Sequence, residues 1–123
     1  FGTLVAFTNP VYDMEGDNKY TANMNVVAEN TGQTMAEYIG VSKESLTRNF
    51  DNHYLVSERQ ARPGVPGMIL ESTYDQGVFK IHNMQLVVIS GGKAYVVTTA
   101  AVESSWEKYR PVFEEVLNSF TLM

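Results

Sequence analysis

The second half of the chain alternates apolar, strand-forming segments with glycine-containing turns. The expected strands are 54–61, 68–75, 79–89 and 93–102. Gln76-Gly77 separates the second strand from the third, and Ser90-Gly91-Gly92-Lys93 suits a two-residue turn with positive φ between the third and the fourth. Parallel neighbours would need a crossover of about a dozen residues. The pattern therefore predicts an antiparallel meander.

The first half contains two more strand patterns and one helix pattern. Strands are expected at Thr3–Thr8 and Ala22–Glu29, with the polar, acidic segment Tyr12–Lys19 between them as a surface loop. The segment Thr34–Phe50 begins with a threonine followed three residues later by a glutamate, which is a capping box. Apolar residues at helical spacing follow, so we predict an amphipathic helix there.

Two of the apolar runs, Leu86–Ile89 and Ala94–Val97, do not alternate with polar residues. A strand with one solvated face alternates, so a continuous run indicates that both faces of the strand are covered. Helix patterns stand before and after the meander. We therefore expect a sheet that lies between helices.

The last element has the helical spacing of an amphipathic helix after a second capping-box pattern, Ser104 to Glu107. Pro111 lies beyond the first turn, where proline is tolerated, so we expect a kink or a short opening turn. The segment Ser119–Leu122 is expected to end as a strand. Trp106 and Tyr109 match the buried stripe, which favours core packing over an aromatic docking patch.

Composition narrows the class of protein without naming a reaction. The chain has 123 residues, 44% hydrophobic and 19% charged, as expected of one globular domain. It has no cysteine, which excludes a disulfide framework, a cysteine nucleophile and a cysteine metal site. A net charge of -5 without a basic cluster argues against a nucleic-acid partner. Its apolar runs are too short to span a membrane.

The residues with chemical potential suggest no reactive site. His53 and His82 have no partner at metal-ligand spacing, so we expect helix capping or a surface position for each. Residues 13–18 resemble part of a calcium loop but fail the EF-hand pattern, which favours a solvated loop. Ser90 is flanked by glycines that the hairpin explains. We therefore expect no catalytic, cofactor-binding or metal-binding residue.

The charged residues near the start of the last helix are interpreted as an ordinary solvated face: Glu103, Glu107, Lys108 and Arg110. The carboxylates of Glu114 and Glu115 are adjacent on the helix and therefore diverge, so they do not form an acid–base pair. Catalysis by this chain alone is not expected.

The carboxy-terminal third carries a pattern of a known family. The hairpin Val88–Ala100 has a tyrosine just after its turn, and Glu103–Phe120 follows at once. This second segment reads aromatic-x-x-Tyr-x-Pro-x-Phe and ends in Asn-Ser-Phe. The order resembles PsbP-like and DcrB-type domains of the Mog/PsbP-like superfamily. The resemblance implies an α+β fold, an α/β/α sandwich whose antiparallel meander sheet is covered by helices on both faces.

Members of that family usually open with a strand reading Gly-Phe-x-Ile-x-Tyr-Pro-x-x-Trp, which has no counterpart before Phe1. We therefore expect residues 1–123 to be a single PsbP-like domain truncated at its N-terminal end, with the opening strand missing. An unpaired sheet edge invites pairing with another chain. We accordingly expect a homodimer through that edge or a swapped element.

The resemblance also supplies the functional hypotheses. The first is a non-catalytic extracytoplasmic binding or assembly domain, secreted or lipid-anchored, the globular part of a bacterial or archaeal lipoprotein with a protein partner. The alternative is an intracellular interaction module, because a related fold occurs in Ran-binding nuclear-import factors. A small hydrolase is a remote alternative that needs a base and a nucleophile near one pocket.

Overall fold

The computed structural model describes residues 2–8, 13–15, 18–61 and 67–120. Its strands are β1 (Gly2–Thr8), β2 (Asp13–Glu15), β3 (Asn18–Tyr20), β4 (Asn23–Asn30), β5 (Asp51–Gln60), β6 (Met68–Gln76), β7 (Phe79–Ser90) and β8 (Lys93–Val102). Its helices are α1 (Met35–Asn49), the 3-10 turn η1 (Glu103–Ser105) and α2 (Trp106–Ser119). Each strand predicted for the main sheet, and each of the two predicted helices, therefore has a counterpart in the structure.

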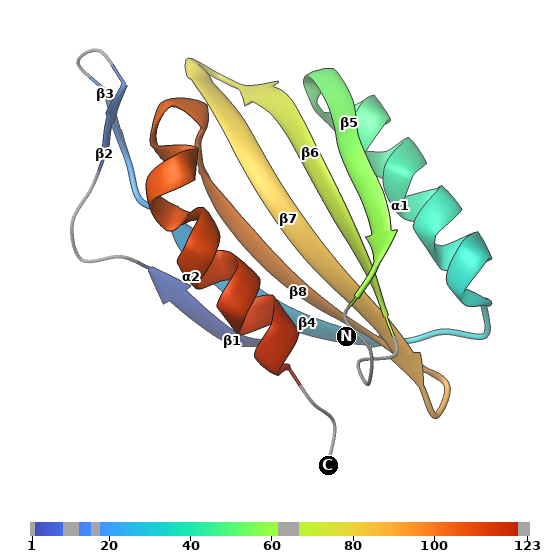
Figure 1. Ribbon diagram of the computed structural model, residues 1–123. Coiled ribbons are helices and arrows are strands. Elements are labelled where there is room, and N and C mark those ends of the chain that lie inside the picture. The colour runs from blue at the N-terminus through green and yellow to red at the C-terminus, as the bar shows by residue number, and fades with distance from the viewer. Residues whose placement is uncertain (1, 9–12, 16–17, 62–66, 121–123) are drawn as a thin grey trace.

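The main sheet is antiparallel and has six strands in the order β1-β4-β8-β7-β6-β5 (Figure 1). Strands β5 to β8 form the predicted meander, and β4 adds to it by pairing with β8. The positive φ angles of Gly91 (59°) and Gly92 (75°) confirm the tight turn between β7 and β8. β1 and β5 are the two edges of the sheet, and the homodimer expected through an edge stays a prediction.

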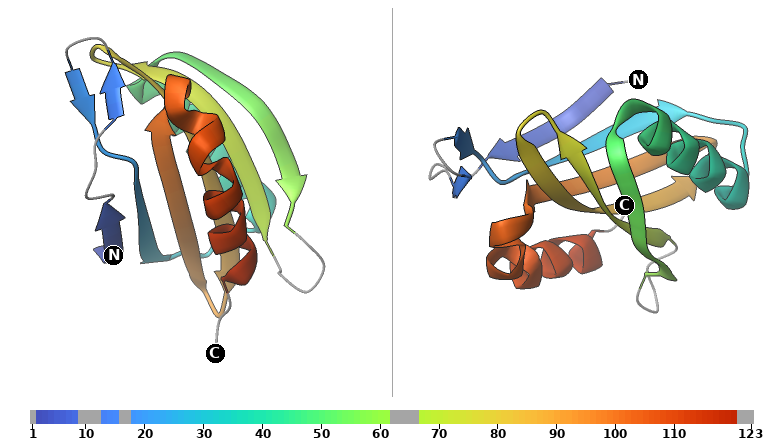
Figure 2. Two further views of the ribbon diagram at one scale, coloured as in Figure 1. Left: turned by 60° about the vertical axis from the view of Figure 1, so that its left-hand side comes forward. Right: turned by 90° about the horizontal axis from the view of Figure 1, so that it is seen from above.

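The two helices lie on opposite faces of the sheet, which confirms the α+β sandwich (Figure 2). They are also offset, because α2 packs on β7 and β8 whereas α1 packs mainly on β5 and also contacts β7. Each helix therefore covers one part of its face. On the α1 side, the part of the sheet formed by β4 and β8 has no helix over it.

The α1 helix begins as predicted. The Thr34 amide donates to Glu37 Oε1 at 2.9 Å, and the Glu37 amide donates to Thr34 Oγ1 at 3.2 Å, so the capping box is complete. Ile39 is the one side chain that this helix buries fully. The helix thus rests on the sheet along a narrow stripe.

The larger core lies between the sheet and α2. Its buried residues are Ala22, Ile69, Met84, Leu86, Val88, Val97, Ala101, Trp106, Phe113 and Leu117. Trp106 is 1% exposed and Tyr109 packs against this cluster, which confirms that the aromatic residues of α2 belong to the core. On the opposite side, Phe50 stacks on Tyr74 with ring centroids 4.2 Å apart, within a smaller cluster.

The prediction that both apolar runs are covered on both faces is correct for most of each run and wrong at the half-buried Ile89 of β7 and at Tyr95 and Val96 of β8. Leu86, Val87 and Val88 are all buried, because α2 covers one face of β7 and α1 reaches the other. Val96 of β8 remains half-buried, since α1 lies toward β5 and does not cover it.

Three local predictions differ from the structure. The expected loop 12–19 contains the antiparallel pair β2 and β3, in which Met14 faces Lys19. The second capping box is absent, because the N-cap of α2 is Ser105 and the Ser105 side chain makes no capping bond. The short opening turn expected ahead of Pro111 is present as η1. The expected terminal strand is wrong at Ser119, which ends α2; residues 121–123 lie outside the described residues.

Asp13 attaches the β2–β3 hairpin to α2. Its carboxylate accepts hydrogen bonds from Lys108 Nζ and from Tyr109 Oη, each at 2.7 Å. The Asp13 side chain is buried, whereas a solvated loop was predicted. Burial alone would raise the pKa of the Asp13 carboxyl, but the two hydrogen bonds and the Lys108 charge outweigh burial and hold this pKa below its usual value.

The Asp13 contacts should make the free energy of unfolding decrease as the pH is lowered. Because the folded-state pKa of Asp13 is lowered, its contribution is fully present above its unfolded pKa and is lost as pH falls through the folded value. We expect Asp13→Asn to lower the free energy of unfolding at pH 7. The difference from the wild type should shrink in urea titrations below about pH 4. A difference that is constant from pH 7 to pH 3 would contradict this assignment.

Gly67 is required by packing rather than by backbone conformation. A Cβ at this position would lie 2.6 Å from the Val87 carbonyl oxygen and 2.9 Å from Val88 Cγ2. We expect Gly67→Ala to cost about 1–3 kcal/mol of unfolding free energy, because the neighbouring backbone of β7 cannot yield. Gly40→Ala is the matched control: it meets no atom within 4 Å and should stabilise α1 by up to about 1 kcal/mol. Equal effects on the urea midpoint would contradict the packing argument.

Candidate functional site

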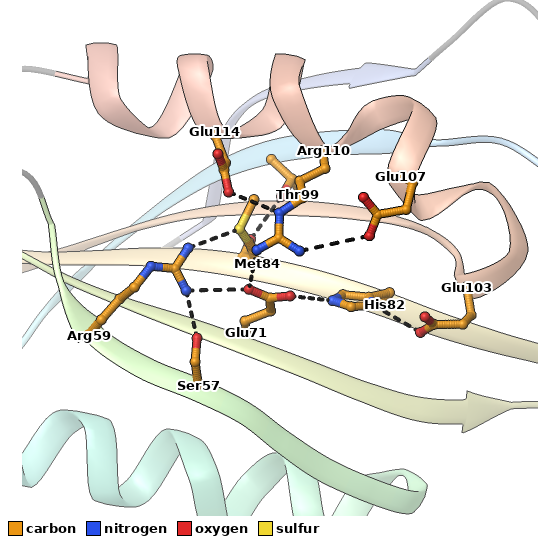
Figure 3. A network of polar contacts seen from close by, with 10 residues as sticks. All are labelled: Ser57, Arg59, Glu71, His82, Met84, Thr99, Glu103, Glu107, Arg110 and Glu114. Carbon is orange, nitrogen blue, oxygen red and sulfur yellow. Dashed lines mark hydrogen bonds and ion pairs between the residues drawn. The ribbon is translucent and has the colours of Figure 1, made fainter.

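A buried carboxylate lies at the centre of the sheet face that α2 covers. Glu71 is on β6, and its side chain is 2% exposed. Its Oε1 is 3.3 Å from Arg59 Nη1 on β5 and 3.5 Å from Arg110 Nη2 on α2 (Figure 3). Arg59 is held in turn by Ser57, whose hydroxyl oxygen is 2.6 Å from Nη1. Two guanidinium groups from different elements thus share one carboxylate oxygen.

His82 occupies the other oxygen of Glu71. Its Nε2 is 2.6 Å from Glu71 Oε2, and its Nδ1 is 2.9 Å from Glu103 Oε2. The imidazole stacks on Trp106, with centroids 4.0 Å apart and planes 9° from parallel. Both ring nitrogens of His82 are therefore engaged by glutamate side chains, one from β6 and one from the turn before α2.

The network corrects the interpretation of the α2 charges as an ordinary solvated face. Glu103 pairs with His82, and Arg110 reaches Glu71 beneath the helix. Arg110 also bonds Glu114 at 3.1 Å through Nε and lies 3.9 Å from Glu107. These groups link α2 to β6 and β7, so the sequence interpretation of His82 as a surface or capping residue is also wrong.

His53 does not join His82. Its Nδ1 is 3.2 Å from Thr47 Oγ1 in the last turns of α1, and its Nε2 is 3.2 Å from Ser72 Oγ on β6. Ser72 and Glu71 are consecutive on a strand, so their side chains point to opposite faces of the sheet. The two histidines therefore lie on opposite sides of the sheet. His53 belongs to β5 and contacts Thr47 of α1, whereas the C-cap of α1 is Phe50, so His53 does not cap the helix. Burial lowers the pKa of His53.

The network has the composition of an acid–base site but a closed geometry. Both oxygens of Glu71 and both nitrogens of His82 are engaged, and Trp106 covers the ring. Glu71 and Glu103 approach His82 from opposite sides, so they do not converge on a point. In the described part of the chain, no group of three or more His, Asp and Glu side chains is placed to hold a metal ion.

A groove is open on the other side of the sheet, between α1 and the strands that α1 leaves uncovered. It encloses about 370 Å³. Its floor is formed by β4, β7 and β8, and its wall by one flank of α1. The lining residues are Val27, Glu29, Gln33, Tyr38, Val41, Ser42, Ser45, Leu46, Gln85, Val87, Val96 and Thr98.

The floor of the groove is ordered in rows across the strands. Val27, Val96 and Val87 are in register and form an apolar row. Two residues along the strands, Gln85 Nε2 donates to Thr98 Oγ1 at 3.1 Å and forms a polar row. The floor therefore combines an apolar row with a row of hydrogen-bonding side chains.

One end of the groove is acidic. Tyr38 of α1 and Glu29 of β4 both line this end. Burial and, after it, the nearby Glu29 carboxylate raise the pKa of Tyr38 to about 12. Tyr38 therefore stays a donor at physiological pH. Among the residues described by the structure, none forms an ion pair with Glu29 within 4.0 Å. Val41, beside this end on α1, is 51% exposed.

Sequence reasoning missed both the polar network and the groove. The signal for the network was a charged residue at an inward position: Ile69, Glu71 and Thr73 share one face of β6. The signal for the groove was weaker, because the apolar run in β8 suggested covered faces. No helix in the described part of the chain is long and apolar enough to cross a membrane.

Comparison with solved structures supports the fold over most of the chain. Protein PA94 of Pseudomonas aeruginosa, of unknown function, matches with a TM-score of 0.80 at 11% identity. The aligned region covers 97% of this chain and 82% of PA94. Cyanobacterial PsbP from Synechocystis matches with a TM-score of 0.63 at 14% identity, and the aligned region covers 100% of this chain and 94% of that protein. LpqN of Mycobacterium tuberculosis, involved in cell envelope biogenesis, matches with a TM-score of 0.54 at 12% identity. The aligned region covers 86% of this chain and 64% of LpqN.

No curated protein sequence matches the chain. The PsbP family profile matches residues 4–122, which include every helix and nearly every strand of the structure. This match agrees with the hairpin and helix pattern of the carboxy-terminal third and with the observed sandwich. The chain belongs to the PsbP family.

Proposed function

We propose that the protein is a non-catalytic binding domain that acts outside the cytoplasm and takes its protein partner in the groove between α1 and β8. The observation that carries this proposal is the uncovered half of the α1 face. It is concave, it has an exposed valine on one wall, and its floor combines an apolar row with hydrogen-bonding groups. Concave surfaces of this mixed kind are where proteins bind ligands.

The closed state of the Glu71–His82 network supports a structural role for it. A general base must reach the proton that it abstracts, within about 3 Å or through one water. The carboxylate of Glu71 is buried under α2 and already bound by His82 and two arginines. We infer that this network holds α2 on the sheet and does not act on a substrate.

The location outside the cytoplasm rests on the family and its relatives. LpqN, which shares the fold, is described as involved in cell envelope biogenesis. The lipid of a bacterial lipoprotein is attached to a cysteine, and these 123 residues contain none. The proposal that this is the globular part of a lipoprotein therefore places the anchor on a segment outside these residues.

A photo-crosslinking amino acid at position 41 tests the groove directly. In cells that naturally make the full-length protein, substitution of Val41 should yield a discrete crosslinked protein, because this side chain lies on the wall of the groove. Val112 is the matched control: it is also an exposed helical valine, 55% against 51%, but it belongs to α2 on the other side of the sheet.

The position-41 species should disappear when Val96→Lys places a charge in the floor of the groove. The same pattern of crosslinks from both positions, or a species unaffected by Val96→Lys, would contradict binding in the groove. The folded state of each variant is checked by urea unfolding of the purified protein.

The structural role of the network predicts a loss of stability. Glu71→Ala leaves Arg59, Arg110 and His82 without their shared partner, and removing one member of a buried ion pair costs about 3–5 kcal/mol. Glu114→Ala removes a half-exposed partner of Arg110 and should cost less than about 1 kcal/mol. Urea denaturation measures the free energy of unfolding of both variants.

Crosslinking from position 41 should persist in the variant Glu71→Gln, which keeps the side-chain shape. Loss of this crosslink in a folded Glu71→Gln protein would place Glu71 in the binding function.

A further inference from the structure

We propose that the groove takes an extended peptide segment that carries a lysine or arginine two residues away from an aliphatic residue. This inference rests on the proposed binding function and specifies the chemistry of the bound segment. The cationic side chain meets Glu29, and the aliphatic side chain lies on the valine row. The partner is thus a protein with an exposed or unfolded basic-apolar segment.

The spacing follows from the rows of the floor. Glu29 and Val27 are two residues apart on β4 and point to the same face. On a strand this separation is about 6.8 Å. Side chains two residues apart in an extended peptide that runs along the strands have the same separation, so one can reach the carboxylate while the other rests on Val27 and Val96.

The next row extends the match by one position. The hydrogen-bonded pair of Gln85 and Thr98 follows the valine row at the same interval. Gln85 uses its amide nitrogen in that bond, so its side-chain oxygen can accept a hydrogen bond from a peptide hydroxyl or amide. A serine, threonine or asparagine four residues from the basic residue fits this end.

The acidic end offers a carboxylate to a cation. Glu29 lines the groove beside Tyr38, and a carboxylate has about four acceptor positions. Glu29 is the one formally charged residue among those that line the groove. A lysine or arginine that binds there forms a charge-assisted hydrogen bond, whereas an acidic side chain would be repelled.

The size of the groove suits the side chains of a bound segment, whose backbone stays at the surface. The groove encloses about 370 Å³, which accommodates a few side chains of an extended peptide. β4 is already paired on both edges, so the segment binds through its side chains and not as an added strand.

The test is an NMR titration of the isotope-labelled protein with three synthetic peptides. The first contains Lys-Ser-Val-Ser-Thr, the second has Glu in place of Lys, and the third, Lys-Ser-Ser-Val-Thr, moves the valine by one position. We expect the first peptide to shift the amide signals of the groove and to bind at least about tenfold more tightly than either other peptide, because a hydrogen bond to a charged group is worth that factor.

Two protein variants separate Glu29 from net charge. Glu29→Gln keeps an acceptor for Tyr38 and should weaken the Lys peptide about tenfold without affecting the Glu peptide to the same extent. Glu44→Gln removes a charge from the outer side of α1, away from the groove, and should leave the affinity unchanged. Equal binding of the Lys and Glu peptides, equal binding of the spacing-shifted peptide, or equal effects of the two variants would overturn the inference.

Failure of the inference about the peptide is distinguishable from failure of the proposed function. If position 41 crosslinks a partner while the peptides do not discriminate, the groove binds a partner of another chemistry and this inference is wrong. If position 41 and position 112 behave alike, the groove is not the binding surface and the proposed function itself is wrong.

Discussion

Two helices are too narrow to cover both faces of this sheet, and the rest of the structure depends on that constraint. Six strands spaced about 4.8 Å apart are about 24 Å wide, whereas a helix covers about 10 Å. Each face must therefore keep part of its area uncovered by a helix. Because α1 lies toward β5 and α2 lies over β7 and β8, the uncovered part on the α1 side falls over β4 and β8. The groove is a direct consequence of that offset.

A buried charge network ties α2 to the sheet beside its apolar packing. The helix packs on two central strands, and its aromatic side chains belong to the larger core. Glu71 fixes the position by binding Arg110 of α2, Arg59 of β5 and His82 of β7 at once. Buried ionic groups of this kind contribute little net stability when compared with apolar packing. We regard their role here as orienting α2 on its own face of the sheet.

The sequence was sufficient for the architecture and insufficient for the site, for physical reasons. Strand order in the meander follows from short turns such as Gly91-Gly92, and α1 follows from the Thr34–Glu37 capping box, because both are local. The position of α1 over β5, by contrast, is set by contacts between residues far apart in the chain. The network was missed for the same reason, since Glu71, His82 and Arg110 come from three elements. Asp13 was taken as solvated because its partners lie more than ninety positions later.

In our proposal, the part of the sheet left open by α1 is the surface that binds a protein partner. The most direct measurement is a crystal structure of the protein with the partner identified by crosslinking. We predict that a partner segment lies between α1 and β8, against Val27 and Val96, with the Glu71–His82 network unchanged. A partner bound over α2, or along β5 with the groove filled by solvent, would contradict the claim.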